Sequence, residues 1–239
     1  MNPKIDDLEQ YRKEVREVCD TYHQAPMRDE YVFCTDEKTG IQALEHARPA
    51  KPMKAGSPEK REQEYIRHGT TGLIASRDVQ TGEIVAPMIR PTRKEKDFVE
   101  HIENVVAQDP EASYVFVVDQ LNTHQSESLV RFVAEYCGIP QDSLGKKRYS
   151  GVLKTKKTRK KFLKDKSHRI QFVYTPKHCS WLNQIECWFS ILCRDLINPR
   201  ASFTSIDDLA YRLAQYIEYY NQHLAKPFHW TFKGRPLQM

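Results

Sequence analysis

The chain lacks the short glycine- and cysteine-based motifs that mark several common enzyme classes. Its nine glycines form neither GxGxxG nor GxxxxGK[ST], so the phosphate cradles of dinucleotide-binding and P-loop enzymes are missing. None of the six cysteines forms a CxxC pair, which argues against a zinc ribbon and a thioredoxin-like site. An HExxH metalloprotease motif is also absent. Any chemistry must therefore rest on other side chains.

Long apolar runs are also missing. The best run, Val115–Val118, is far shorter than the roughly 18 residues of a membrane span. The N-terminus, MNPKIDDLEQ, lacks the basic-then-apolar pattern of a signal peptide. We therefore expect a globular protein that is neither secreted nor membrane-bound, with reduced cysteines.

Positive charge is concentrated in one segment. Residues 146–169 contain twelve Lys or Arg and one acid, a charge of +11, whereas the whole chain carries only +5 and the remainder therefore −6. Such a patch attracts a polyanion, because bound phosphates release their counterions. A run of like charge is also typical of a solvated, mobile loop, and the sequence leaves both interpretations open.

Apolar periodicity divides the chain into alternating elements. Helices are predicted at 7–22, 92–108, 126–136, 181–197 and from Ser205 onward. Strands are predicted at 31–36, 69–76, 82–89, 114–118 and 170–174, with 37–40 as the turn after the first strand, 69–89 as a hairpin and 47–62 as a loop. This order predicts a mixed α/β sheet with helices on its faces.

Three carboxylates stand at informative places in this pattern. Asp36 and Asp119 come where predicted strands end, and Glu186 lies early in a predicted apolar helix. Each alone has an ordinary explanation as a turn residue or as a helix-dipole partner. Together they form a set of hard oxygen ligands that suits Mg²⁺ or Mn²⁺. Two such ions activate an attacking oxygen and stabilise the leaving one in phosphodiester cleavage.

Longer motifs extend the pattern beyond the carboxylates. They are CTDEKTGIQALEH (34–46), GSPEKREQEYIRHGT (56–70), VVDQLNTHQSESLVRFV (117–133), YTPKHCSWLNQIECWFSIL (174–192) and KPFHWTFKGRPL (226–237). With these segments the chain resembles the DDE-superfamily transposases of bacterial insertion sequences, in the branch related to mariner elements. The similarity runs from about residue 25 to the end.

The resemblance implies an RNase H-like catalytic domain over residues 25–239, preceded by a helix or linker remnant, 1–24. Asp36, Asp119 and Glu186 match the family's catalytic, metal-binding carboxylates, and the implied cofactor is Mg²⁺ or Mn²⁺, with two ions. The spacing from Asp119 to Glu186 is longer than in mariner elements. The excess lies in residues 141–168, interpreted as a basic insertion before the last core helices.

The resemblance also implies an activity and partners. A metal-activated water would cut the ends of the element, and the freed 3′-hydroxyl would attack target DNA. The expected partner is double-stranded DNA, bound by a homodimer in the bacterial cytoplasm at the nucleoid. Residues 1–24 are too short for the family's helix-turn-helix domains, so we expect a separate helix-turn-helix polypeptide, a split reading frame or a truncated remnant.

Neighbouring residues have secondary roles in this interpretation, and two other functions stay open. Glu37 is interpreted as a turn residue and Trp188 as core. The residues expected to contact DNA are Lys154, Lys156, Lys157, Arg159, Lys160, Lys161 and His178, and those expected to support the site are Asn122, His124 and Asn183. The alternatives are an RNase H-like nuclease without strand transfer and an inactive DNA-binding remnant.

Overall fold

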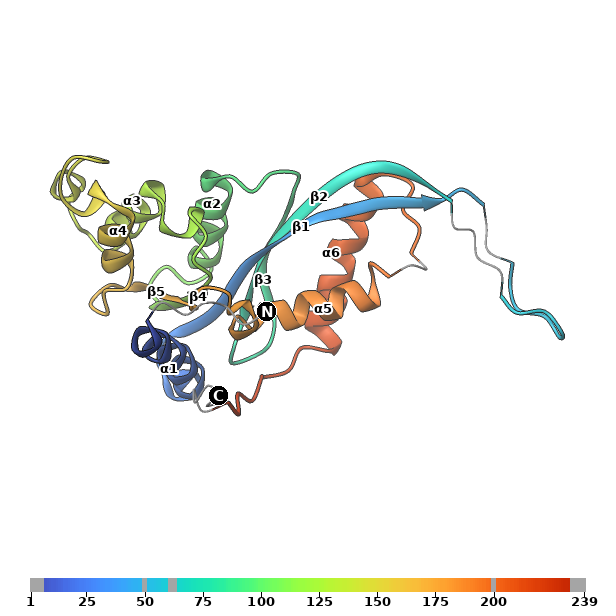
Figure 1. Cartoon of the computed structure of the whole chain (residues 1–239), viewed down its shortest axis with the longest axis horizontal. Helices are drawn as coiled ribbons and strands as arrows, with labels where there is room; N and C mark the ends of the chain where they lie inside the picture. Colours follow the sequence, from blue (N-terminus) through green and yellow to red (C-terminus); the bar gives the residue numbers. More distant parts are fainter. Residues whose placement is uncertain (1–6, 49–50, 60–63, 199–200, 233–239) are drawn as a thin grey trace.

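A computed structural model describes residues 7–48, 51–59, 64–198 and 201–232. It contains one five-stranded sheet in the order β3-β2-β1-β4-β5 (Figure 1). The strands are β1 (Tyr31–His46), β2 (Tyr65–Asp78), β3 (Ile84–Arg90), β4 (Tyr114–Val118) and β5 (Ile170–Tyr174). β1, β4 and β5 are parallel to one another, and β2 pairs antiparallel with both β1 and β3. The predicted mixed sheet is therefore confirmed.

Parts of four predicted segments lie outside the described residues: the start of 1–24, part of the loop 47–62, part of the motif 56–70 and the end of the motif 226–237. All six cysteines are free, as expected. In the described part of the chain, no helix is both long and apolar enough to cross a membrane.

β4 is buried on both faces, as its uninterrupted apolar sequence predicts. Because successive side chains of a strand point to opposite faces, Val115 and Val117 belong to one apolar cluster. Tyr114, Phe116 and Val118 belong to the other. The sheet therefore separates two cores.

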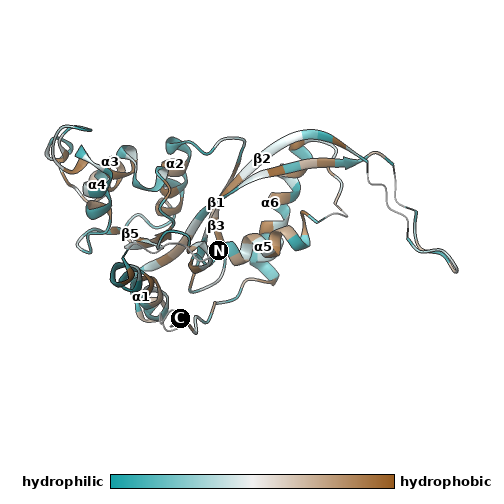
Figure 2. Cartoon of the chain, viewed as in Figure 1, coloured by the Kyte–Doolittle hydropathy of each residue, from teal (hydrophilic) through white to brown (hydrophobic). Residues whose placement is uncertain are grey.

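Helices cover both faces of the sheet. One core includes α1 (Leu8–Gln24), α5 (Ile185–Asp195) and α6 (Ile206–His223). The other includes α2 (Glu95–Val106), α3 (Glu127–Tyr136) and α4 (Lys156–Leu163). In Figure 2 these helices carry both hydrophilic and hydrophobic residues, as expected of helices with one face on a sheet.

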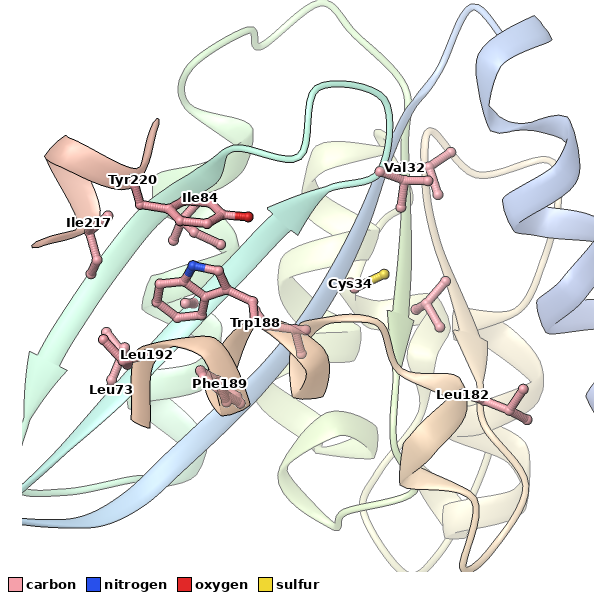
Figure 3. Packing of buried hydrophobic residues seen from close by; sticks show 14 of the residues in the cluster. Val32, Cys34, Leu73, Ile84, Leu182, Trp188, Phe189, Leu192, Ile217 and Tyr220 are labelled. Atoms are coloured by element: carbon pink, nitrogen blue, oxygen red, sulfur yellow. The ribbon is translucent and has the colours of Figure 1, made fainter. Parts of the chain in front are cut away.

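Trp188 lies at the centre of the first core (Figure 3). Its fully buried indole packs 5.9 Å from the ring of Tyr220 on α6 and 5.5 Å from that of Phe189. The prediction that Trp188 is a core residue is confirmed. This packing joins α5, and with it Glu186, to the rest of the domain.

The first strand is much longer than predicted. β1 continues past Asp36 to His46, paired with β2 throughout, so the predicted turn at 37–40 is wrong. The pairing register shifts between Lys38 and Ile41, and Gly40 there has a φ of +68°. Glycine adopts this left-handed conformation readily, and the sequence signal of a turn is in fact a β-bulge.

Helix α5 begins later than predicted. A 3₁₀ turn, Ser180–Leu182, precedes it, and Asn183 has extended backbone dihedrals, so the α-helix starts at Ile185. Glu186 is consequently in the first turn of the helix.

The insertion 141–168, which contains most of the basic segment, is folded, and the interpretation of the basic segment as a solvated loop is wrong. The insertion contains two 3₁₀ turns and α4, whose N-cap Thr155 accepts a hydrogen bond from the Thr158 amide. Three leucines of the insertion are fully buried in the second core: Leu144, Leu153 and Leu163. Their burial fixes α4 against α3 and β5.

Candidate active site

The parallel pairing of β1 with β4 brings the two predicted aspartates to one place. Cys34 of β1 stands opposite Val117 of β4, so Asp36 and Asp119 each lie two residues further along neighbouring strands. The Asp36 side chain is buried, whereas that of Asp119 is 37% exposed. The site therefore has a protected side and a side open to solvent.

The two carboxylates influence each other electrostatically. Burial, together with the negative charge of Asp119, raises the pKa of Asp36 to about 7. Burial also acts on Asp119, but its hydrogen bond and ion pair with His124 lower the pKa of that carboxyl below its usual value. Two negative charges thus oppose each other at this place, and a bound cation would favour the ionised form of both carboxyls.

His124 bridges the two strands from a 3₁₀ turn, Thr123–Gln125, that follows β4. The imidazole Nδ1 lies 2.7 Å from Asp119 Oδ1, and Nε2 lies 3.3 Å from Glu37 Oε1. The ring is fully buried, 4.1 Å from that of Phe98. Burial opposes protonation, but the two carboxylates outweigh it and raise the pKa of His124 to about 10. A charged imidazolium therefore ties Asp119 to β1.

Glu37 is the residue that sequence reasoning missed. Its side chain is only 3% exposed, so its interpretation as a turn residue is wrong. The ligand atoms of Asp36, Glu37 and His124 lie within 4.8 Å of one another. The group includes neither Asp119 nor Glu186, and a charged His124 has no lone pair to offer a metal, so the carboxylates are the groups in it that can bind a cation.

Asn183 supports the first aspartate from the segment just before α5. Its fully buried Nδ2 donates to Asp36 Oδ2 at 3.3 Å and to the Thr35 carbonyl at 3.0 Å. Its Oδ1 is buried and has no partner in the part of the chain that the structure describes. The contact fixes one oxygen of Asp36 and leaves a polar atom next to the site unsatisfied.

Glu186 lies three residues after Asn183, half-buried, on the helix that packs against β1. Within the described ranges its carboxylate makes no hydrogen bond or ion pair, and only its backbone is bonded. The structure therefore places Glu186 on the element next to Asp36 without direct contact to either aspartate.

One end of the basic segment reaches the site. Lys156 Nζ donates to Asn122 Oδ1 at 2.7 Å and to the Gln120 carbonyl at 3.2 Å. Both acceptors lie within three residues of Asp119, whose carboxylate Lys156 also influences electrostatically. The first turn of α4 thus borders the part of the sheet where Asp36 and Asp119 lie, which we call the candidate catalytic edge.

The other residues expected to contact DNA fall into two groups. Lys154, Lys157, Lys161 and His178 are exposed. Arg159 and Lys160 are engaged: the guanidinium donates to the Gln125 and Leu153 carbonyls, and Lys160 Nζ lies 3.5 Å from Glu14 and 5.1 Å from the Tyr174 ring centroid. These two side chains hold α4 in place.

The raised pKa of Asp36 predicts a pH-dependent stability in metal-free buffer. An acid that titrates near pH 7 when folded and near 3.8 when unfolded destabilises the native state progressively as pH rises between these values. We expect Asp36→Asn to relieve this cost. The melting temperature of the variant minus that of the wild type should therefore increase as the pH rises from 5 to 8. Each kcal/mol relieved corresponds to about 2–4 °C.

Asp142→Asn, at an exposed position, is the matched control and should show a constant difference. A constant difference for Asp36→Asn as well would mean that its carboxyl titrates normally.

The chain is similar to known endonucleases and transposases. A family model described as DDE superfamily endonuclease matches residues 31–210. The catalytic domain of Mos1 mariner transposase has a similar fold, with a TM-score of 0.52 at 8% identity, covering 91% of this chain and 85% of that one. No curated protein matches the chain.

Longer Mos1 chains give similar values. The paired-end complex with the left transposon end has a TM-score of 0.53 at 12% identity, covering 91% of this chain and 57% of that one. The Mos1 mariner paired-end complex with Mn has a TM-score of 0.54 at 11% identity, covering 91% of this chain and 60% of that one. The chain therefore spans less than two thirds of these Mos1 chains. The shared architecture confirms the expected RNase H-like fold.

Proposed function

The chain belongs to the DDE superfamily of endonucleases, and from that membership we propose that it is the catalytic domain of a DNA transposase. It would cleave phosphodiester bonds at element ends and transfer the 3′-hydroxyl into target DNA. The observation that carries this proposal is the convergence of Asp36 and Asp119 at one edge of the sheet, bordered by a basic helix. Mos1 neighbours solved with transposon-end DNA support DNA as the partner.

The residues of the site fit a divalent cation. Asp36 and Asp119 supply oxygen ligands of the kind that Mg²⁺ and Mn²⁺ prefer, and the carboxylate of Glu186 is free to join them. The buried Oδ1 of Asn183, which has no hydrogen-bond partner among the described residues, is a further oxygen near Asp36 that favours a cation. A Mos1 paired-end complex contains Mn, which supports the same choice, and we propose two ions.

Each neighbouring residue has a role in this proposal. A bound divalent ion would lower the pKa of an attacking water and stabilise the leaving oxygen. His124 holds Asp119 against β1, and Asn183 fixes Oδ2 of Asp36, so both ligands are oriented before DNA arrives. Lys156, beside Asn122, places a positive charge where a phosphate would approach.

We also propose that two copies of the chain assemble on DNA in the bacterial cytoplasm and that a separate helix-turn-helix polypeptide recognises the element ends. These proposals extend the resemblance of the sequence to insertion-sequence transposases.

A strand-transfer assay tests the proposal against a nuclease without joining activity. The substrate is a labelled duplex with a free 3′-hydroxyl end, mixed with supercoiled plasmid and Mn²⁺. We expect the label to move into the plasmid with the wild type and not with Asp119→Asn. Plasmid nicking without transfer of the label would favour the nuclease.

The exposed lysines of α4 should supply sequence-independent DNA affinity. Replacing Lys157 and Lys161 by Ala should weaken binding to all duplexes alike and lower the slope of log affinity against log salt by about 0.9 for each phosphate that is no longer neutralised. Lys226→Ala, at an exposed lysine outside α4, is the control and should change the slope less. A slope that Lys157→Ala and Lys161→Ala leave unchanged would show that these lysines are merely solvated.

A further inference from the structure

A groove of about 570 Å³ lies away from the candidate catalytic edge, between α1 and the start of β4 and β5. Figure 1 shows α1 running beside these two strands. Val115, Gln171 and Val173 of the strands line the groove, and Lys13 and Arg16 line it from α1. The groove therefore combines a partly apolar floor with a basic wall.

The lining of the groove carries more positive than negative charge. It has five basic and two acidic side chains. Lys164 is paired with Glu17 at 2.6 Å, and Arg28 with Glu30 at 2.9 Å. Three basic side chains of the groove have no carboxylate partner among the described residues: Lys13, Arg16 and Lys166. The one acid of the groove that, within the described ranges, is not paired with them or with another lining cation is Asp20.

The groove is connected to the candidate catalytic edge by the basic segment. Lys164 and Lys166 lie at the C-terminal end of α4, and Lys156, at its N-terminal end, contacts Asn122 beside Asp119. α4 has eight residues and is therefore about 12 Å long, roughly the axial length of three to four base pairs. A DNA backbone that leaves the candidate catalytic edge along α4 thus arrives at the groove.

We propose that this groove binds the sugar-phosphate backbone of the DNA that flanks the cleaved bond. The inference rests on the proposed function, and it adds α1 to the DNA interface. Free cations on two walls, Lys13 and Arg16 on one and Lys166 on the other, can each neutralise a phosphate of a bound strand.

Lysine footprinting on the unmodified chain tests this proposal. The protein is acetylated with and without a 30-base-pair duplex, in the absence of divalent metal, and the modified lysines are quantified by mass spectrometry. We expect DNA to slow acetylation of Lys13 and Lys166 several-fold, together with Lys157 and Lys161. The exposed Lys226, outside the groove, should react equally in both samples.

A pair of variants measures the contribution of the groove to affinity. Lys13→Ala with Lys166→Ala should weaken duplex binding and lower the salt slope by about 1.8, because two phosphates are no longer neutralised. Arg12→Ala with Lys226→Ala removes the same charge from exposed positions outside the groove and should have a smaller effect.

The outcomes separate this inference from the proposed function. Protection of Lys157 and Lys161 without Lys13 and Lys166 would overturn the groove and leave DNA binding by α4 intact. Protection of none of the four would overturn both. If millimolar inorganic phosphate protected Lys13 and Lys166 as well as DNA does, the groove would be a small-anion site, and the proposal would be wrong.

Discussion

Asp36→Asn and Asp119→Asn are each expected to reduce metal-dependent DNA cleavage by several orders of magnitude while the protein stays folded. The amide has nearly the shape of the carboxylate but brings no negative charge to a divalent ion. Asp36 is buried beside Asn183, and Asp119 is held by His124, so both positions retain neighbours that keep the backbone in place. The measurement is the rate of nicking of supercoiled plasmid in Mn²⁺.

The control for this pair is Asp142→Asn, an exposed acid of the insertion 141–168, which should nick at the wild-type rate. Circular dichroism melting curves would verify that all three variants are folded. Near-wild-type nicking by Asp36→Asn or Asp119→Asn would remove that residue from the set of metal ligands.

Glu186→Gln is expected to have a comparably large effect on cleavage, although Glu186 touches neither aspartate in the structure. If Glu186 acts only through the dipole of α5, in whose first turn it lies, its charge stabilises the helix by less than about 1 kcal/mol. Its replacement would then leave cleavage unchanged. As a metal ligand, it would be needed for cleavage and for the extra thermal stability that Mn²⁺ gives by binding the native state. We expect loss of both, with DNA binding preserved.

Asp207→Asn is the matched control, because Asp207 is an acid in the first turn of α6. It should retain both cleavage and the Mn²⁺-induced rise in melting temperature. If Glu186→Gln behaved like this control, Glu186 would be only a helix-dipole residue, and the proposed ligands would be confined to Asp36 and Asp119.

Part of the fold could be predicted because β4 is apolar throughout and β5 nearly so. Both strands begin and end at the predicted residues, since their burial leaves a run in which Gln171 is the one polar residue. The extension of β1 could not be predicted. After Asp36 its polar residues are held in the strand by pairing with β2, and Gly40 carries the local signal of a turn.

The candidate site shows the same division. Asp36 and Asp119 could be predicted as site residues because each comes at the end of an apolar run. The role of Glu37 depends on His124, 87 residues later in the chain, and no local pattern encodes that contact. Likewise, the extended backbone of Asn183, which lets its amide reach Asp36, follows from a 3₁₀ turn that helical periodicity does not reveal.

The most direct test of the metal site is a calorimetric titration of Mn²⁺ into the wild type and into the double variant Asp36→Asn/Asp119→Asn at pH 8. At this pH the wild-type Asp36 is mostly ionised, since its pKa is about 7, and so is ready to bind. We expect saturable Mn²⁺ binding by the wild type and none by the double variant. Equal binding by the two proteins would contradict the assignment of these carboxylates as the metal ligands of the active site.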